Sequence, residues 1–462
     1  MDLGAHVHFV GIGGYSLSGL ARVLLQMGQT VSGSDVASSD RTRVLEEMGA
    51  TVYLGHQAEN LEGADLVVYS TEIHPDNPEL AAARERGMCV IHRSVLQGWM
   101  VDERRGVAVA GTHGKTSTTS MTAVLLDQAG FHPTVLVGGE MAHFGGTGRL
   151  GSGEYLVVEA DESDHSFLQF RPEIAVATNV EPEHLEHYGG DFSRIVAAFE
   201  QYVSQVRPGG LAVLCGDDPN LRAIAGRSRT RCRLYGLGPD HELRAENIRR
   251  QGDITHYDVF LNGQPLGEGR LRIPGNHMVC NSLAVIAVGL EVGIPFERAV
   301  EILSQFTNAK RRFQVIAEVA GVRVEDDYAH HPTEIRATLQ AARQTTAGKV
   351  IAAFQPQRYI RTKNLMNEFS RAFSAADRII LTEIYAPPGE PPIPGVSSSV
   401  LADLIRDHEG REVKLFGDQE EMAQYLTEVA RPGDTVLTMG AGDIWKVAKE
   451  VGKRLETRAR TG

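Results

Sequence analysis

A glycine turn that contains a lysine carries the strongest chemical signal in this sequence. It follows an apolar strand at 107–110 and precedes a helical pattern. In such a turn the backbone amides surround phosphate oxygens, a lysine ammonium reaches the β and γ phosphates, and a threonine hydroxyl can ligate Mg²⁺. We therefore predict nucleotide binding by Gly111, Thr112, His113, Gly114, Lys115, Thr116 and Ser117. Because Val109 stands where the Walker A pattern has its first glycine, an ordinary strand-helix turn is the alternative.

Carboxylates and a histidine follow two other apolar strands. Glu159 ends the strand 155–159 and opens an acidic run, and His184 stands in a polar run after the strand 174–178. Open parallel sheets bind ligands at this end of their strands, and oxygen ligands suit Mg²⁺. We predict metal ligation by Thr116 and Glu159, with His184 as a ligand of a second metal. A solvated acidic loop and a structural histidine are the alternatives.

The first strand of the chain, 6–10, also enters a glycine turn. The turn contains Gly11, Gly13 and Gly14. Asp35 closes the next strand, so the arrangement is Rossmann-like, with glycines for close phosphate approach and a carboxylate for a ribose hydroxyl. Ser16 replaces the third glycine of GxGxxG, which makes the signal weak for NAD. A diphosphate-bearing nucleotide is expected here, and tight packing without a ligand is the alternative.

Two polar runs in the last third of the chain also follow strands. The run 326–333 contains a histidine pair that includes His330, and the run 354–362 contains Arg358 and Arg361. Arginines beside histidines suit planar, bidentate recognition of a carboxylate or a phosphate. Surface charge after strands is the alternative.

Strand and helix patterns that alternate almost from end to end must position these residues, and they predict an α/β fold. The predicted strands are 6–10, 30–34, 66–69, 107–110, 155–159, 174–178, 211–215, 322–326, 350–354, 378–382 and 435–439. Helices are predicted at 16–26, at 280–292 and after Trp445. Polar stretches at 101–106 and 307–312 read as junctions, so we expect three domains at 1–104, 105–310 and 311–462.

Composition narrows the classes of partner. The 46 Lys and Arg against 59 Asp and Glu leave a net charge of −13 without a basic block, so nucleic acid is not expected. The cysteines lie far apart without metal spacing and are predicted to be core thiols in a reducing compartment: Cys89, Cys215, Cys232 and Cys280. No apolar run reaches about 18 residues and no leader precedes the first strand, so we expect no membrane span and a cytoplasmic location.

Together these runs resemble the Mur ligase family over essentially the whole chain. The resemblance rests on the glycine turn, the acidic run 159–164, Gly275-Asn276-His277 with Asn281, and Arg311-Arg312-Phe313. Within the family, the N-terminal glycine turn and the runs 326–334 and 354–362 are similar to the alanine-adding member. The resemblance implies Rossmann-like N-terminal and C-terminal domains around a central P-loop ATPase-like domain with a mostly parallel sheet.

The family's activity implies ATP and Mg²⁺, with Mn²⁺ as a possible substitute, as cofactors. It implies UDP-N-acetylmuramate and L-alanine as substrates, joined through an acyl-phosphate in peptidoglycan precursor synthesis by a monomer or weak homodimer. The UDP substrate would contact Gly11, Gly13, Gly14, Ser18, Asp35, Ser70, Thr71 and His92. Asn281 would contact adenine, Arg312 the γ-phosphate, and the amino-acid end would be lined by Tyr328, His330, Arg358 and Arg361, with Asp327 nearby.

The sequence departs from the family pattern at Ser16, Leu17, His165, Ala329 and Gln357. Gln357 stands where histidine often precedes Arg358, so it bears on the preference for alanine. The alternatives are a recycling ligase that attaches a ready-made peptide, an NAD-dependent dehydrogenase, and a non-catalytic nucleotide sensor.

Overall fold

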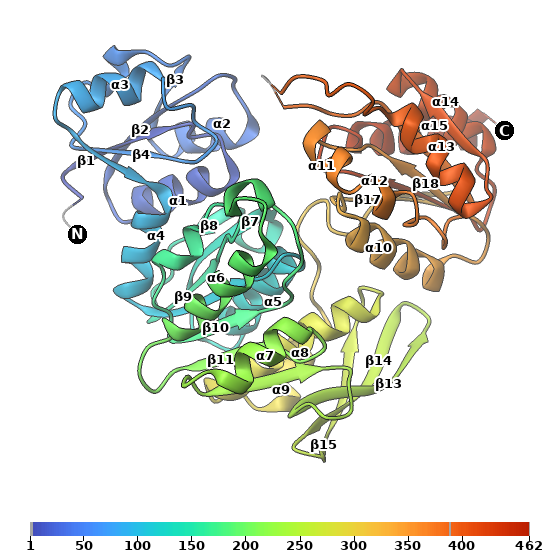
Figure 1. The fold of residues 1–462 in the computed structure, drawn as a ribbon, viewed down its shortest axis with the longest axis horizontal. Coiled ribbons are helices and arrows are strands. Elements are labelled where there is room, and N and C mark those ends of the chain that lie inside the picture. The colour runs from blue at the N-terminus through green and yellow to red at the C-terminus, as the bar shows by residue number, and fades with distance from the viewer. Residues whose placement is uncertain (1–2, 388–389, 462) are drawn as a thin grey trace. The chain divides into compact units, whose positions relative to one another are not determined.

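The computed structural model describes residues 3–387 and 390–461, and Figure 1 shows their elements in chain order. It has three α/β domains with mostly parallel sheets, as the sequence predicts. The chain forms two compact units. One unit holds the chain through Ile248 together with 257–270 and 280–309, and the other holds 249–256, 271–279 and the chain from Lys310 onward. Among the described residues, no helix combines the length and the apolar character that crossing a membrane requires.

The N-terminal domain is built on a five-stranded parallel sheet in the order β3-β2-β1-β4-β5. Its strands are β1 His6–Val10, β2 Thr30–Asp35, β3 Thr51–Leu54, β4 Leu66–Tyr69 and β5 Cys89–His92. Its helices are α1 Tyr15–Gln26, α2 Asp40–Glu47, η1 Ala58–Leu61, α3 Pro78–Glu85 and α4 Arg93–Asp102. Four consecutive residues of β1, from Val7 to Val10, are buried, which is the pattern of a parallel strand covered on both faces.

The central sheet has ten strands in the order β15-β14-β13-β12-β11-β10-β6-β9-β7-β8. Its strands are β6 Arg105–Ala110, β7 Thr134–Met141, β8 Gly146–Arg149, β9 Tyr155–Glu159, β10 Ile174–Ala177, β11 Leu211–Cys215, β12 Cys232–Gly236, β13 Leu243–Gln251, β14 Ile254–Leu261 and β15 Gln264–Leu271. The helical segments are α5 Lys115–Gln128, η2 Ala142–Phe144, η3 Ser166–Gln169, η4 Leu185–Tyr188, α6 Phe192–Ser204, α7 Pro219–Arg227, α8 Asn276–Glu291 and α9 Phe296–Leu303.

The sequence predicted the parallel strands that carry the polar runs and missed most of the other strands of this sheet. In β14, buried Thr255, Tyr257 and Val259 alternate with partly exposed polar residues, so the strand lacks the continuous apolar run of β6 or β11. The stretch 101–106, predicted as a junction, contains little irregular structure. α4 ends at Asp102 and β6 begins at Arg105, so most of that stretch belongs to a helix and a strand.

The C-terminal domain has a six-stranded sheet in the order β16-β17-β21-β18-β19-β20. Among the described strands of this sheet, only β16 pairs in the antiparallel sense. The strands are β16 Gln314–Val319, β17 Val322–Asp327, β18 Val350–Phe354, β19 Arg378–Thr382, β20 Val413–Phe416 and β21 Thr435–Met439. The helices are α10 Pro332–Thr345, α11 Tyr359–Asn364, α12 Met366–Phe369, α13 Ser398–Glu409, α14 Gln419–Val429 and α15 Trp445–Thr461.

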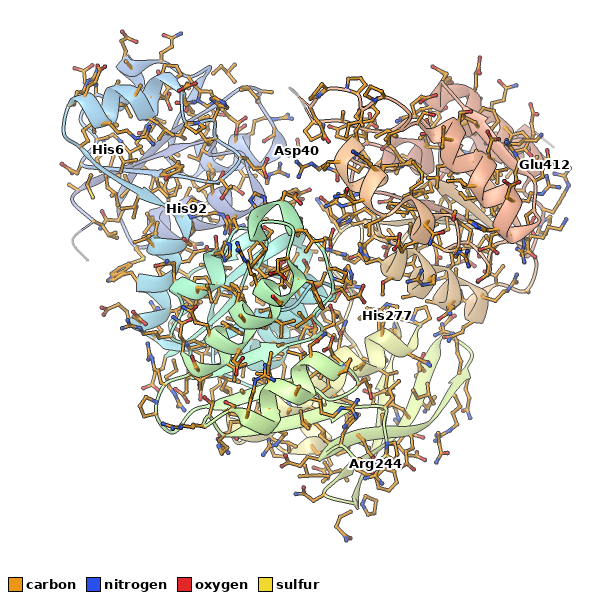
Figure 2. The ribbon with its side chains drawn as sticks, in the orientation of Figure 1. His6, Asp40, His92, Arg244, His277 and Glu412 are labelled. Atoms are coloured by element: carbon orange, nitrogen blue, oxygen red, sulfur yellow. The ribbon has the colours of Figure 1, made fainter. Side chains whose placement is uncertain are left out.

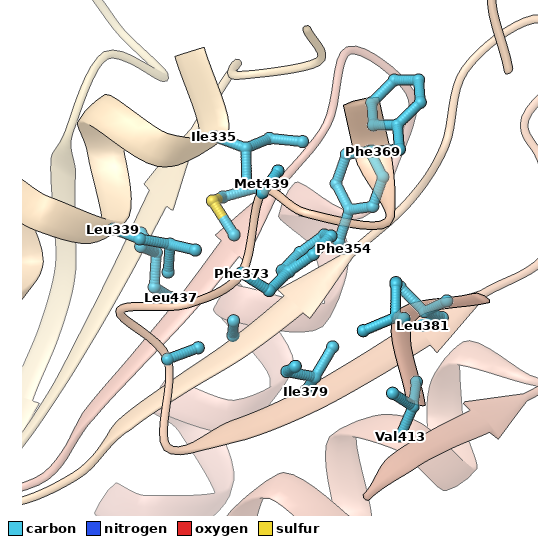
Figure 3. Close-up of a cluster of buried hydrophobic side chains, with 14 of the residues drawn as sticks. Ile335, Leu339, Phe354, Phe369, Phe373, Ile379, Leu381, Val413, Leu437 and Met439 are labelled. Carbon is cyan, nitrogen blue, oxygen red and sulfur yellow. The ribbon is translucent and has the colours of Figure 1, made fainter. Parts of the chain in front are cut away.

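Two apolar cores cover the opposite faces of this sheet. Alternate residues of β18 separate between them, since Phe354 belongs to the cluster in Figure 3 and Ala353 belongs to the second cluster. The phenyl rings of Phe369 and Phe373 pack on Phe354, with ring centroids 5.6 Å away in each case. The sheet is thus held between helices, and the polar runs after β17 and β18 begin at its edge.

Candidate active site

The lysine-containing turn joins β6 to α5, as predicted, and its glycines are required by its shape. Gly111 has φ +136° and a Cβ there would lie 1.9 Å from Oγ1 of Thr178, while Gly114 has φ +81° and precedes α5. The residues after β10 hold the turn in place. Thr178 Oγ1 donates to the carbonyl of His113 at 2.5 Å, and the amide of His113 donates to Oδ1 of Asn179 at 2.8 Å. Neither of these supporting residues was singled out from the sequence.

The ammonium of Lys115 folds back over its own turn. It donates to the carbonyls of Gly111 and Thr112, at 2.7 and 3.1 Å, and pairs with the buried carboxylate of Glu162 at 2.9 Å. Burial lowers the pKa of Lys115, but the surrounding carboxylates outweigh burial and raise it above its ordinary value. Burial raises the pKa of Glu162 to about 7, although the Lys115 ammonium opposes the shift. Phosphate oxygens would therefore compete with Glu162 for this ammonium.

A hydroxyl and a carboxylate meet at the start of α5. Oγ1 of Thr116 donates to Oε1 of Glu159 at 3.0 Å, and the amide of Gly138 donates to Oε2 of the same carboxylate at 2.8 Å. A Cβ on Gly138 would lie 2.6 Å from Glu159 Oε1, so only glycine allows this approach. These two oxygens lie next to the lysine-containing turn at 111–117, which is called the phosphate turn below after its predicted role. Hard oxygen donors placed side by side fit the requirements of Mg²⁺. His184, the third predicted ligand, precedes η4 with φ +54°, and its Nε2 lies 3.9 Å from the carboxylate of Glu183.

The acidic run after β9 also connects to the N-terminal domain within the same compact unit. Nη2 of Arg93 pairs with Asp161 at 2.9 Å and with Asp164 at 3.2 Å. Oδ2 of Asp164 accepts a hydrogen bond from Thr71 Oγ1 at 2.5 Å and lies 3.7 Å from Nε2 of His92, which is labelled in Figure 2. Two of the residues predicted for the UDP substrate thus adjoin the acidic run. Arg93 was not predicted, because a single arginine at a helix start has no sequence signature.

Arg93 also accounts for the charge state of the acidic run. Burial alone would raise the pKa of Asp161, but the Arg93 guanidinium and the Lys115 ammonium lower it to about 2. Burial lowers the pKa of His92. At neutral pH Asp161 is therefore ionised and the His92 imidazole, which lies near Asp164, is neutral.

The N-terminal glycine turn is closed by the carboxylate predicted to bind a ribose. The amide of Gly13 donates to Oδ2 of Asp35 at 2.9 Å, and Nε of Arg41 donates to the carbonyl of Gly13 at 2.7 Å. Gly11 has φ +85°, and Gly14 precedes α1. Arg41 was missed because it lies outside any motif.

The remaining residues predicted for the UDP substrate differ in accessibility. Ser70 follows β4 and is half-buried. Ser18 is only 4% exposed, and its Oγ lies 3.3 Å from Oγ1 of Thr147 in the central domain. Ser18 thus packs between two domains rather than lining an open surface.

Asn281 lies in α8 against the phosphate turn. Its Oδ1 is 3.0 Å from the place that a Cβ on Gly114 would take, and its side chain is 7% exposed. The structure therefore brings a residue far along the sequence next to Lys115's turn, as its predicted role near a nucleotide requires.

In the second compact unit, a buried carboxylate organises the residues around β17. Asp327 accepts hydrogen bonds from the amides of Phe313 and Ala329 at 2.6 and 2.7 Å. Burial raises the pKa of Asp327 to about 6, with Arg312 opposing the shift. The Arg312 guanidinium lies 5.2 Å from the centre of the Tyr328 ring. Nδ1 of His330 lies 2.9 Å from the Tyr328 carbonyl, which places these side chains in one cluster.

The two predicted arginines lie at the start of α11. Arg358 has φ +68°, an uncommon conformation for a residue with a side chain, and its Nε is 3.4 Å from a carboxylate oxygen of Glu390. Arg361 donates to the side-chain oxygen of Gln357. Gln357, the residue that departs from the family pattern, therefore orients one of the two arginines.

Comparison with known proteins gives consistent results along the chain. Family models match in three consecutive parts: the Mur ligase family catalytic domain at 6–105, the Mur ligase middle domain at 109–289, and the Mur ligase glutamate ligase domain at 311–442. The UDP-N-acetylmuramate--L-alanine ligase of Symbiobacterium thermophilum is 55% identical, over 98% of this chain and 95% of that protein.

Two further relatives cover nearly all of both chains. The UDP-N-acetylmuramate--L-alanine ligase of Pelotomaculum thermopropionicum is 48% identical over 100% of each. The solved structure of UDP-N-acetylmuramate-alanine ligase from Thermotoga maritima superposes with a TM-score of 0.84 at 29% identity, over 98% of this chain and 99% of that one. With the phosphate turn, the acidic run and the three domains in place, these matches show that the chain belongs to the Mur ligase family.

Proposed function

We propose that this chain is an ATP-dependent ligase that joins L-alanine to the carboxylate of UDP-N-acetylmuramate, a step in peptidoglycan precursor synthesis. The observation that carries the proposal is the arrangement of Lys115 in a glycine turn beside the Thr116 and Glu159 oxygens. The relatives that share about half of its residues over their whole lengths bear the name of this activity. With no helix able to span a membrane among the described residues, a cytoplasmic location is part of the proposal.

The reaction proceeds in two transfers. A carboxylate oxygen of UDP-N-acetylmuramate attacks the γ-phosphorus of ATP, the bond to the β,γ-bridging oxygen breaks, and ADP leaves an acyl-phosphate. The amine of L-alanine then attacks the acyl carbon, phosphate departs with the bonding electrons, and the nitrogen loses a proton. Activation is needed because a free carboxylate is a poor electrophile.

The central domain supplies positioning and charge for the first transfer. Lys115 exchanges Glu162 for the β and γ phosphates, and the turn amides bind the same oxygens. Thr116 and Glu159 would hold Mg²⁺ with His184 at a second metal, and the ion would neutralise charge that develops on the phosphates. Asn281 contacts adenine, and Arg312, with Asp327 close to it, contacts the γ-phosphate.

The outer domains bind the two other substrates in this proposal. The domains are 1–104, 105–310 and 311–462, and the first holds the UDP moiety at its glycine turn. Tyr328, His330, Arg358 and Arg361 line the amino-acid and acyl-phosphate end. The enzyme acts as a monomer or a weak homodimer.

Phosphate release from ATP, measured with UDP-N-acetylmuramate and each of a panel of amino acids, tests the proposal. Release that requires both the sugar nucleotide and L-alanine is the expected result. A requirement for a ready-made tripeptide in place of alanine would identify the recycling ligase instead. Gln357 makes this distinction worth measuring, because it orients Arg361 at the proposed amino-acid end.

A further inference from the structure

Two thiols far apart in the sequence lie in contact within the central domain. Sγ of Cys215 and Sγ of Cys280 are 3.7 Å apart. Cys215 ends β11 and is buried, whereas Cys280 lies in α8 and is partly exposed. We propose that this pair is a reversible oxidation site, at which a small peroxide forms a Cys215–Cys280 disulfide that weakens ATP binding.

The two sulfur atoms need to move only a short distance to form a disulfide. Disulfide sulfurs lie about 2.05 Å apart, so the two atoms must approach by roughly 1.7 Å, which is within reach of side-chain rotation with a small backbone shift. A hydrogen bond from Cys280 lowers the pKa of the Cys215 thiol, with help from the backbone amides of Asp217 and Asp218. Thiolate is the form of cysteine that reacts with peroxides, so Cys215 is the attacking group.

A nearby carboxylate raises the question of a metal ion. Oxygen of Asp217 lies within 4.8 Å of both sulfurs. However, this carboxylate already accepts hydrogen bonds from the amides of Leu237 and Gly238, at 2.7 and 2.9 Å, and from Nε2 of His241 at 2.8 Å. The Asp217 carboxylate therefore anchors the loop after β12. The two thiols form a pair of their own.

The oxidation is a two-electron reaction with balanced atoms. The Cys215 sulfur attacks one oxygen of hydrogen peroxide, the O–O bond breaks, and a sulfenic acid forms while hydroxide takes the thiol proton and leaves as water. The Cys280 sulfur then attacks the Cys215 sulfur, the S–O bond breaks, and a second water forms from the expelled hydroxide and the Cys280 proton. The thiols are oxidised, the peroxide is reduced, and a dithiol reductant reverses the change.

The expected consequence for ATP rests on the proposed ligase function. Cys280 adjoins Asn281, whose side chain packs against Gly114 of the phosphate turn. Drawing Cys280 toward β11 displaces Asn281 relative to that turn. Since a misplacement of about 1 Å can cost up to ~10²-fold in an enzyme, we expect the KM for ATP to rise by about tenfold.

The first test maps the disulfide without any activity measurement. The reduced full-length chain is treated with hydrogen peroxide, free thiols are capped, and the digest is examined by mass spectrometry. A peptide pair linked through Cys215 and Cys280 and separated by dithiothreitol is expected. Cys89 is exposed, so its prediction as a core thiol is wrong, and its oxidation reports that the oxidant has acted. Oxidised Cys89 without the linked pair, or co-purified zinc that protects both thiols, would overturn the proposal.

The second test measures the KM for ATP before and after oxidation. We expect the KM for ATP to rise in the oxidised chain and to recover with dithiothreitol. In Cys280→Ser, which leaves buried Cys215 in place, oxidation should not change the KM for ATP. Cys232→Ser is the matched control, because Cys232 is partly buried with its thiol donating to Thr230, and it should respond like the unmodified chain. A linked chain with an unchanged KM for ATP contradicts the proposal. A chain inactive in both states contradicts the ligase function instead.

Discussion

The glycine turns after β1 and after β6 each join a buried parallel strand to a helix, and different side chains close them. In the N-terminal turn a carboxylate closes the loop, since Asp35 accepts from the Gly13 amide and Arg41 donates to the Gly13 carbonyl. In the central turn an ammonium closes it, since Lys115 donates to two turn carbonyls and pairs with Glu162. The backbone arrangement is the same in both turns. A carboxylate contacts an amide of the first turn, whereas an ammonium contacts carbonyls of the second.

In the proposed function, this difference allows one kind of turn to bind two different nucleotides. Glycine provides close backbone approach and a helix N-terminus provides amides, but neither distinguishes a reacting triphosphate from a diphosphate used as a handle. A lysine with a carboxylate and a hydroxyl beside it can neutralise charge that moves during phosphoryl transfer. A carboxylate at the strand end can accept from a sugar hydroxyl and has no such role. Substitutions at either turn test this difference in roles.

The largest effect is expected at the central turn. Lys115→Ala should lower kcat/KM for ATP by about 10²–10³-fold, because the variant loses charge that stabilises the transferring phosphoryl group. ADP production measured by a coupled assay reads this out. Lys446→Ala, which removes an exposed lysine paired with its near neighbour Asp443, is the control and should leave the rate unchanged. Near-normal ADP production by Lys115→Ala would refute the assignment of this turn.

A somewhat smaller loss is expected from the carboxylate beside that turn. Glu159→Gln keeps the shape but removes the negative charge, so it should lower the rate by about 10²-fold and raise the Mg²⁺ concentration needed for half-maximal rate. A Mg²⁺ titration of the ligase rate measures both. Glu154→Gln, a mainly exposed carboxylate just before the same strand, serves as the matched control. An unchanged Mg²⁺ requirement would remove Glu159 from the metal site.

The N-terminal turn should respond through a different substrate. Asp35→Asn weakens a charged hydrogen-bond acceptor, so we expect the KM for UDP-N-acetylmuramate to rise roughly tenfold while the KM for ATP stays constant. Steady-state kinetics with each substrate varied in turn provides the measurement. Asp40→Asn tests the specificity of the effect, because Asp40 is exposed and pairs with the exposed Arg43. A change in the KM for ATP alone would contradict the division of roles between the turns.

The smallest effect is a dependence on pH that the central turn alone should show. Burial raises the pKa of Glu162 to about 7, so the carboxyl is protonated below that pH and releases Lys115 to a phosphate. As pH rises through about 7, Glu162 ionises and competes for the ammonium, and the KM for ATP should rise by a few-fold. In Glu162→Gln this rise should disappear. An equally steep profile in that variant would show that another group titrates.

Much of the candidate site was predictable because it is local in the sequence. The turn around Lys115 and the acidic run after β9 each follow a continuous apolar strand, and parallel strands present such ends at one sheet edge. The structure confirms that Thr116 and Glu159 meet there. Strands such as β14 were missed because they lack such an apolar run, since partly exposed His256 and Asp258 separate the buried residues of β14.

Residues whose contacts lie in distant segments of the chain could not be predicted from the sequence. Arg93 meets Asp161 across 68 positions of sequence, and nothing in the residues around Arg93 indicates that partner. Ser18, which the family resemblance assigns to the UDP substrate, meets Thr147 across 129 positions of sequence, and no pattern around Ser18 indicates that partner. Proximity in sequence served as a guide to proximity in space only within a single strand-turn-helix unit.

The sequence by itself determined the α/β class, the two glycine turns and the charge beside each, because strand periodicity and turn chemistry depend on neighbouring residues alone. Only the tertiary structure decided which distant groups meet: Asn281 against Gly114, Arg93 with Asp161, and Cys215 in contact with Cys280. These contacts depend on the order and register of the strands, and that order depends on how the whole chain packs. Burial follows from the same packing, so the shifted pKa values of Glu162 and Asp327 belong to the fold as well.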